Sequence, residues 1–236
     1  MKSRNFALAL SLVVLLSACR KSEVDQKPAA EVNDTTATTA AATSTEPAPG
    51  GVQSKVIKEK SSIEFVAAKV TRDHKGKFNN FDGWIEYVDK KPSRISFEID
   101  TNSIETDTEK LTGHLKTPDF FDVAKYPKAT FTSSSLTDAG GGKYELKGTL
   151  DMHGMQKELT IPVTAAVTPE GVRTTSEFTI NRQDWGIAYK GAPDDLIKDN
   201  VLIKLNLMFP PLHRVVRKPT PCPGTRSPCS RSASRS

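Results

Sequence analysis

The sequence predicts an all-β domain of antiparallel strands that close into a barrel or a flattened sandwich. Apolar and polar residues alternate with a period of two through most of the region from Val52 to Phe209, as in strands with one buried face. Short turns, several of them rich in glycine, separate these segments. Such strands bury their apolar faces only by closing on one another. About eight strands are expected, and a barrel of that size holds side chains or one small ligand.

The strands are expected one after another along the chain, mostly joined by tight turns. The strictest alternation is "RISFEID", with Ile95, Phe97 and Ile99 on one face. Gly83 is expected to mark a bend, and "TDAGGG" at 137–142 is expected to turn a hairpin. The predicted strands lie within residues 62–70, 76–88, 94–100, 129–136, 142–152, 155–167, 171–180 and 200–209.

One short helix is predicted, in "DTEKLTGHLK" at 107–116. Leu111 and Leu115 are four residues apart and share a helix face, and acidic residues gather at the start, where the helix dipole favours them. Pro118 ends the helix. We expect the helix to cross between two strands and to bring the pair Phe120 and Phe121 against one side of the barrel.

Residues 1–18 are predicted to be a lipoprotein signal peptide. The apolar stretch "FALALSLVVLL" has eleven residues, fewer than the roughly 20 that span a bilayer. "LSAC" resembles the bacterial lipobox, in which cleavage leaves the cysteine, here Cys19, as a lipid-modified N-terminus. A secretory signal that happens to contain a cysteine is the alternative. Because Arg20 and not an aspartate follows Cys19, the signal resembles those of outer-membrane lipoproteins, and we expect a lipid-anchored protein on the periplasmic side of the envelope.

Residues 19–51 are predicted to be the lipidated cysteine followed by a disordered tether. The segment is rich in alanine, threonine, proline and charged residues. Such a composition buries too little apolar surface to offset the entropy lost on ordering. As a random coil the tether would reach about 30 Å from the membrane.

The formal net charge of +5 comes from the ends of the chain. Residues 210–236 hold six basic residues and no acidic one, and the signal peptide holds two more. The remaining 25 of the 33 basic residues stand against 28 acidic ones, a charge near −3, so no nucleic-acid partner is expected. The tail at 210–236 is predicted to be disordered and dispensable. A functional tail, in which Cys222 and Cys229 pair in an oxidising compartment, is the alternative.

The sequence contains no recognisable catalytic motif. The four histidines are isolated, and no zinc-protease, nucleophile-elbow, phosphate-loop or Rossmann signature occurs. No cysteine lies between residues 20 and 209, and Cys222, Cys229 and His213 supply too few ligands for a metal site. We therefore expect a protein that is not an enzyme and that uses neither a metal nor a cofactor.

Five segments resemble, in order, the motifs of the YceI-like family of bacterial envelope proteins, also called the polyisoprenoid-binding family. "SSIEFVAAKVTRDHKGKFNNFDGWIEY" is similar to the family's opening pair of strands, and "GTLDMHGMQKELTIPV" to its Gly-x-Leu-x-x-His-Gly-x-x-Lys segment. The most recognisable block contains the predicted helix and the phenylalanine pair. The similar segments are residues 61–87, 99–133, 148–163, 178–189 and 199–209.

The resemblance implies an extended antiparallel β-barrel, similar to lipocalins, over residues 52–209. In this family the barrel encloses a long tunnel that holds an isoprenoid, a quinone or a fatty-acid amide. It thus implies non-catalytic binding or carriage of an amphiphilic lipid in the cell envelope. Many relatives that hold ligands pair up, so a homodimer is a further possibility.

The expected ligand-binding residues are mainly aromatic, because inward-facing rings suit a greasy tunnel. Lys69, His74 and Asn181 are expected near its mouth. For His74 and His153, a hydrogen bond that stabilises a turn is the alternative to ligand contact. The residues expected to line the tunnel are Phe65, Phe78, Phe81, Phe97, Phe120, Phe121, Phe131 and Trp185.

A second class of function stays open. Each phenylalanine taken alone suits plain core packing, so the barrel could be filled and could act through a protein partner in stress tolerance or envelope maintenance. A carrier has a continuous apolar cavity, whereas a packed barrel has none. The two hypotheses therefore differ in what lies inside the sheet.

Overall fold

Antiparallel strands make up most of the computed structural model, which describes residues 22–34, 51–192 and 195–211. The predicted lipidation site Cys19 and nearly all of the predicted tail at 210–236 lie outside these residues. One helix, α1 (Glu109–Leu115), is flanked by Thr108, whose hydroxyl accepts the backbone N–H of Leu111. The predicted crossing helix is therefore confirmed. The 3₁₀ turns are η1 (Glu23–Gln26), η2 (Lys58–Lys60), η3 (Thr101–Ser103) and η4 (Arg182–Trp185).

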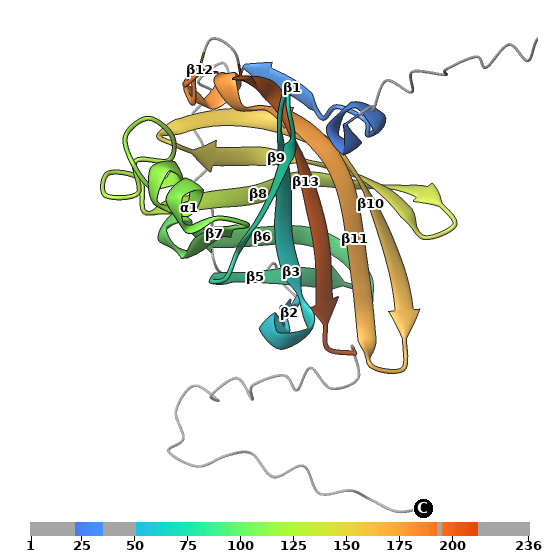
Figure 1. Cartoon of the computed structure of the whole chain (residues 1–236). Helices are drawn as coiled ribbons and strands as arrows, with labels where there is room; N and C mark the ends of the chain where they lie inside the picture. Colours follow the sequence, from blue (N-terminus) through green and yellow to red (C-terminus); the bar gives the residue numbers. More distant parts are fainter. Residues whose placement is uncertain (1–21, 35–50, 193–194, 212–236) are drawn as a thin grey trace, which may run out of the picture.

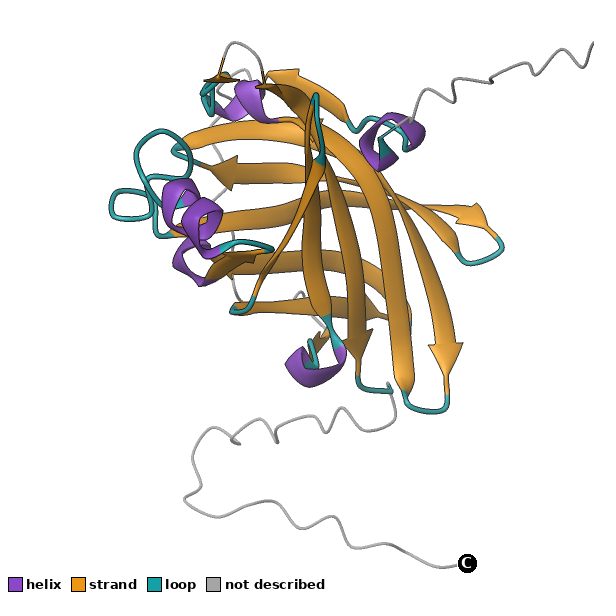
Figure 2. Ribbon diagram, in the orientation of Figure 1, coloured by secondary structure: helices purple, strands orange, loops and turns teal. Residues whose placement is uncertain are grey.

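The strands form one curled sheet (Figure 1, Figure 2). Neighbours along the sheet run β2-β5-β6-β8-β9-β10-β11-β13-β3-β4-β7, with β1 added on β10 and β12 on β13. The strands are β1 (Glu31–Asp34), β2 (Val52–Lys55), β3 (Ser62–Lys69), β4 (Asp73–Phe78), β5 (Phe81–Val88), β6 (Lys91–Asp100), β7 (Ile104–Thr106), β8 (Lys128–Gly140), β9 (Lys143–Met152), β10 (Met155–Thr168), β11 (Gly171–Asn181), β12 (Gly191–Ala192) and β13 (Asp195–Phe209).

The antiparallel, lipocalin-like fold class is confirmed, but the predicted number of strands is wrong. The described residues form a sheet of 13 strands with β2 and β7 at its two edges, so it is a curled half-barrel. The predicted strand at 76–88 is two strands, β4 and β5, because Asn79 and Asn80 between them donate their backbone N–H groups to Ser103 in the η3 turn. The other additions, β1, β2, β7 and β12, have two to four residues, too few to show a period of two.

Alternating side chains of the long strands meet inside the curl. Phe97 on β6 stands opposite Phe131 on β8, and Ile85 on β5 opposite Ile95. These residues belong to or pack against one hydrophobic cluster that draws on most strands of the sheet. Burial of each large apolar side chain contributes about 1.5–3 kcal/mol, so this inner face is the main source of stability.

Part of the segment predicted to be a disordered tether is ordered. We call residues 22–34 the N-terminal strap. Its η1 turn packs Val24 on the outside of the sheet against Val66, Ala68 and Leu202, and β1 then pairs with β10. The prediction failed because the segment is stabilised by contacts with distant strands, which its own composition does not reveal.

Two hydroxyl groups are buried without a hydrogen-bond partner among the described residues, Ser54 Oγ and Tyr87 Oη. The Tyr87 side chain belongs to the hydrophobic cluster and is 5% exposed. Burial raises the pKa of Tyr87 to about 12, since the phenolate is poorly solvated there.

Tyr87→Phe is expected to stabilise the protein by about 1 kcal/mol, because it removes an unsatisfied buried hydroxyl while keeping the ring. The phenol is harder to ionise when folded, so the wild type should lose stability as pH rises from about 10 to 12, where unfolded tyrosine ionises first. Urea unfolding at pH 7 and pH 11 measures both effects. A wild type and a variant with parallel stability–pH curves would contradict the assignment.

Candidate functional site

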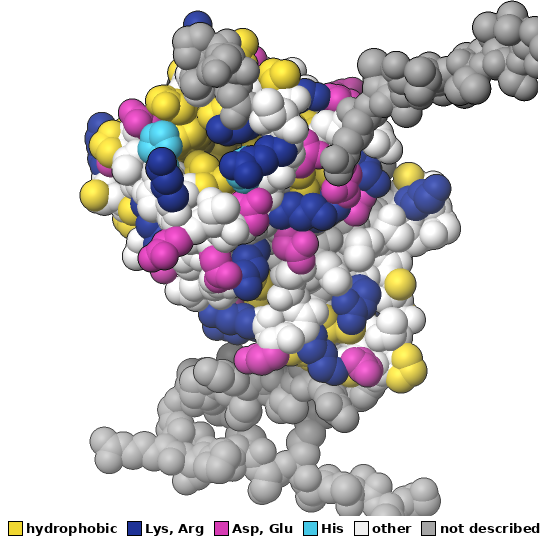
Figure 3. All heavy atoms as spheres, in the orientation of Figure 1, with side chains coloured by type: hydrophobic (Ala, Val, Ile, Leu, Met, Phe, Trp, Pro, Cys, Tyr) yellow, Lys and Arg dark blue, Asp and Glu magenta, His cyan; other side chains and the backbone are white. Residues whose placement is uncertain are grey.

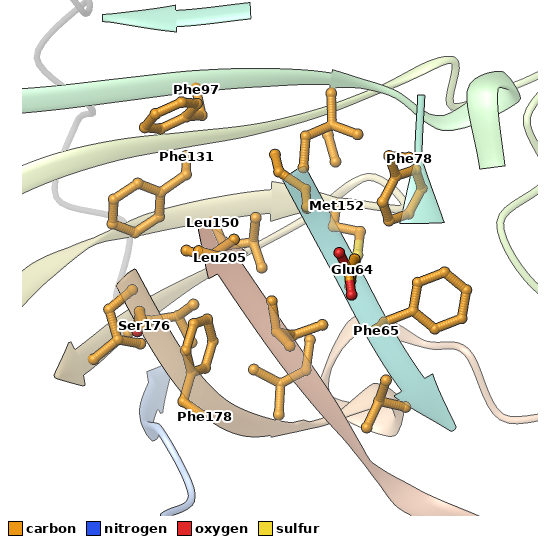
Figure 4. A pocket seen from close by; sticks show the side chains of 18 of the residues that line it. Glu64, Phe65, Phe78, Phe97, Phe131, Leu150, Met152, Ser176, Phe178 and Leu205 are labelled. Atoms are coloured by element: carbon orange, nitrogen blue, oxygen red, sulfur yellow. The ribbon is translucent and has the colours of Figure 1, made fainter. Parts of the chain in front are cut away.

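A cavity of about 200 Å³ lies inside the curled sheet. Its walls come from β3, β4, β6, β8, β9, β10, β11 and β13, and from the segment that follows α1. Figure 4 shows the rings of Phe65, Phe78, Phe97, Phe131 and Phe178 around a common space. Most of the remaining lining is aliphatic, including Ile63, Ile161, Leu150, Leu205 and Met152. The site is therefore an apolar enclosure suited to hydrocarbon.

Glycines on neighbouring strands hold three of the lining rings flat against the wall. Phe65 stands opposite Gly76, and Phe97 opposite Gly83. A Cβ atom at either glycine would overlap the ring, and a Cβ at Gly148 would lie 2.5 Å from the ring of Phe131. Because the glycines leave room for the rings, the rings do not project further into the cavity.

Aromatic contacts extend from the cavity wall to the segment after α1. The ring of Phe78 lies 5.7 Å from that of Phe65 and 5.9 Å from that of Phe121. The backbone N–H of Phe121 donates to the carbonyl of Leu115, which ties this segment to the end of α1. The predicted phenylalanine pair thus closes one end of the cavity.

The same end carries a cluster of three rings near the surface. His114 lies 5.0 Å from both Phe120 and Tyr189, and its Nε2 lies 2.9 Å from a carboxylate oxygen of Asp119. Tyr189 is 39% exposed and Leu196 is 47% exposed. Figure 3 shows hydrophobic side chains in a hollow at this end of the molecule, next to the α1 segment. We take this end as the mouth of the cavity.

Arg182 is the basic residue among the described residues that line the cavity. Its guanidinium donates to the carbonyls of Ile187 (2.6 Å) and Lys198 (3.2 Å) and to Asp199 Oδ1 (3.0 Å). Desolvation lowers the pKa of Arg182, although Asp199 acts in the opposite direction. Arg182 therefore braces the segments at the mouth and places a cation at the edge of an apolar space.

Hydroxyl groups lie among the lining residues further along β11. Thr174 and Ser176 are buried and line the cavity, and Ser176 Oγ donates to the carbonyl of Pro162 at 2.5 Å. Glu64 and Thr175 also border the cavity but are exposed to solvent. The polar lining thus consists of a few separated groups.

Six of the eight aromatic residues predicted for the tunnel line the cavity: Phe65, Phe78, Phe97, Phe120, Phe121 and Phe131. The other two do not. Phe81 is buried in the core beside Ile99, its partner in register. Trp185 is the last residue of η4 and is fully buried, and its Nε1 donates to the carbonyl of Leu150 at 3.2 Å.

The three polar residues predicted at the mouth do not line the cavity. His74 is 4% exposed, and its Nδ1 lies 2.9 Å from Asp107. Asn181 Oδ1 accepts the N–H of Gln183 and caps η4. Lys69 ends β3, where its N–H donates to the carbonyl of Arg72. His153 Nδ1 lies 3.0 Å from the Trp185 carbonyl. This contact fits the alternative given for His153 above, a hydrogen bond that stabilises a turn.

Sequence reasoning missed two features of the site. It read Gly83 as a bend, whereas Gly83 lies inside β5 under the ring of Phe97. It also overlooked Arg182. A glycine opposite a phenylalanine on a paired strand is a usable signal, but it requires the register between strands.

The described residues contain no group of three histidine, cysteine or acidic side chains placed to hold a metal ion. No helix within those residues has the length and apolarity needed to cross a bilayer. What the site can do chemically is remove an apolar chain from water and hold it by dispersion and the hydrophobic effect.

A model of the YceI-like domain matches residues 55–209. Among individual proteins, a UPF0312 protein of Vibrio cholerae is 33% identical over 126 residues, 50% of this chain and 67% of that protein. Protein YceI of Salmonella arizonae is 36% identical over 88 residues, 36% of this chain and 46% of that protein.

Two solved structures share the fold. BcnA of Burkholderia cenocepacia has a TM-score of 0.60 and 27% identity, over 64% of this chain and 98% of BcnA. A polyisoprenoid-binding domain of Saccharophagus degradans, implicated in plant cell wall breakdown, has a TM-score of 0.56 and 18% identity, over 68% of this chain and 98% of that domain.

Proposed function

The chain belongs to the YceI-like family, and from this membership and the cavity we propose that it binds an amphiphilic lipid without chemical turnover. The observation that carries the proposal is the continuous apolar lining inside the sheet, with Arg182 at one end. A linear hydrocarbon chain fits this description better than a compact polar metabolite, because few polar groups converge on the space.

The energetics favour a long tail and a small head. Each methylene that leaves water for an apolar environment contributes about 0.8 kcal/mol, so a tail of several isoprene or methylene units binds without specific polar contacts. The head group then lies at the mouth, near Arg182 and the His114 cluster. An isoprenoid, a quinone or a fatty-acid amide meets these requirements, and the polyisoprenoid-binding domain of Saccharophagus degradans has the same fold.

We place the protein at the periplasmic side of the cell envelope, anchored through Cys19. Because the N-terminal strap is ordered, the distance between this anchor and the folded part of the chain is short. Only Arg20 and Lys21 separate Cys19 from Ser22, the first described residue. At about 3.3–3.6 Å per extended residue, Ser22 lies within roughly 10 Å of the anchor. The folded part of the chain therefore begins much closer to the anchor than the reach of about 30 Å expected for a disordered tether.

Native mass spectrometry of the full chain, followed by organic extraction, tests the function. We expect one isoprenoid, quinone or fatty amide for each chain, and the same spectrum reports whether the protein is a dimer. A chain that is empty and that fails to take up such lipids when they are offered would contradict the proposal. That result would favour a packed barrel that acts through a protein partner.

A variant whose cavity is filled by larger side chains tests whether the lipid binds there. Leu150 and Leu205 line the cavity and are only partly buried, so Leu150→Phe with Leu205→Phe adds two rings to the space. We expect at least about a tenfold loss of bound lipid, which corresponds to about 1.4 kcal/mol of binding free energy. Val167→Phe, at an exposed position of β10 that neither lines the cavity nor lies at its mouth, is the control and should bind normally.

A further inference from the structure

The N-terminal strap lies between two strands that would otherwise pair. β10 and β11 pair only along the last five residues of β10. Continuation of that register would bring Thr160 opposite Thr179. Instead, Thr160 pairs with Glu31, and Thr179 forms a parallel bridge with Ala29. Figure 1 shows β1, in blue, beside β11 and β10.

A proline explains where the two strands separate. Pro162 lies in β10 just beyond the paired part, and its carbonyl accepts the Ser176 hydroxyl of β11. Proline has no backbone N–H, so β10 lacks the donor that would continue the ladder toward β11. With one strand between them, β10 and β11 are about 9–10 Å apart, twice the usual spacing.

The inner face of the strap packs against the cluster that surrounds the cavity, although no strap residue is among those that line it. Ala30 belongs to the hydrophobic cluster, and Val32 packs against it. Val32 stands opposite Leu159, and Ala29 bridges to the residue that directly follows Phe178 on β11. Leu159 and Phe178 both line the cavity. Removal of the strap would therefore leave β10 and β11 unpaired beside these two lining residues.

The strap is attached by contacts that are few and mostly at the surface. It has a ladder of four residue pairs with β10, two backbone hydrogen bonds between Thr179 and the segment 28–30, and the Ser22 hydroxyl donating to Asp73. Its apolar contacts are those of Val24, Ala30 and Val32. Segments with so few buried contacts open at low free energy. Exposed ion pairs add little to their stability. The ion pairs are Glu23–Lys204, Asp25–Lys198 and Lys27–Glu177.

We propose that the N-terminal strap is a removable strand that closes a lateral opening into the cavity, and that the lipid enters and leaves while the strap is detached. This inference rests on the proposed lipid-binding function. Detachment leaves the sheet intact, because β10 stays paired with β9 and β11 stays paired with β13. The strap also precedes the part of the chain that matches the family model, residues 55–209.

A disulfide across the seam tests the proposal. Glu31→Cys with Thr160→Cys joins two residues that are partners in register, at a separation that a disulfide spans. The full chain carries serine at Cys19, Cys222 and Cys229 so that only the new pair forms. Uptake and release of a fluorescent polyene fatty acid, presented in phosphatidylglycerol vesicles, are followed with the disulfide oxidised and then reduced.

We expect the oxidised lock to slow uptake and release at least about tenfold, with little change in equilibrium affinity, and reduction to restore both rates. The matched control is Thr137→Cys with Glu145→Cys, an exposed pair in register between β8 and β9, which should leave the rates unchanged in either state. Equal rates for the oxidised and reduced lock would overturn the strap proposal and leave lipid binding intact. Failure of every form to bind the fatty acid would overturn both proposals.

A variant that weakens the attachment of the strap should have the opposite effect to the disulfide. Val24 anchors the strap on the outer face of the sheet, away from the cavity, so Val24→Ala weakens attachment without altering the lining. We expect uptake and release to become severalfold faster, and amide hydrogen exchange to rise in the strap before it rises elsewhere. Faster exchange in the strap with unchanged lipid rates would contradict the proposal.

Discussion

Gly83→Ala is expected to remove most of the lipid binding while the protein still folds. A Cβ atom at residue 83 overlaps the ring of Phe97 and lies 2.8 Å from the Ser96 carbonyl oxygen, so the backbone must shift slightly and the ring must move away from β5 into the cavity. Overpacking of this kind costs about 1–3 kcal/mol of stability. The displaced ring also occupies space needed by the lipid tail, and affinity should fall at least about tenfold, or 1.4 kcal/mol. Lipid titration and urea unfolding measure the two effects.

Two further variants separate this mechanism from a general effect of alanine. In Gly83→Ala with Phe97→Leu, the smaller side chain no longer meets the new methyl group, and binding should recover. Gly113→Ala is the control: Gly113 lies in α1, and apart from its chain neighbours and the backbone of its own helix no atom lies within 4 Å of the place that the new methyl group would take, so binding should be unchanged. Helix stability should rise there by about 0.5–1 kcal/mol. Normal binding by Gly83→Ala would show that the glycine does not set the cavity's shape.

Trp185→Ala is expected to cause the largest loss of stability, about 3–5 kcal/mol. Its side chain is fully buried, and its removal also leaves the Leu150 carbonyl without its donor. The sequence predicted a tunnel role for Trp185, but the residue does not line the cavity. The variant should therefore bind lipid with near-normal affinity whenever it is folded. The urea midpoint and a lipid titration at low temperature measure the two properties.

The second tryptophan of the chain is the matched control. Trp84 lies on β5 and is half-buried, with Arg94 5.9 Å from its ring centroid. Its loss removes partial burial and a weak cation–π contact, for which about 1 kcal/mol is expected. Equal destabilisation by Trp84→Ala and Trp185→Ala would contradict the structural role. A stable Trp185→Ala that no longer binds lipid would instead support the predicted tunnel role.

Local patterns predicted the features that depend on neighbours in sequence. Alternation over "RISFEID" predicted β6 and its inward Phe97, because successive residues of a strand face opposite sides. The glycines at 140–142 predicted the β8–β9 hairpin, and all three have the positive φ that glycine tolerates. The spacing of Leu111 and Leu115 predicted α1, because residues four apart lie on the same face of a helix.

Features that depend on the pairing of distant strands escaped prediction. Gly83 is recognisable as a site for the Phe97 ring only when β5 and β6 are in register, and Trp185 is seen to be structural only once Leu150 lies beneath it. His74 meets Asp107 across 33 residues of chain. None of these contacts leaves a periodic trace in the sequence.

Residue spacing and side-chain polarity were enough to predict the all-β class, the crossing helix and the aromatic character of the interior. Which rings line the cavity and where the N-terminal strap lies depend on contacts between segments that are far apart in the chain. The strap has the composition of a flexible tether, and it is ordered because Pro162 separates β10 from β11 and leaves two strand edges to be paired. Buried backbone groups require hydrogen-bond partners, and here a distant segment of the chain supplies them.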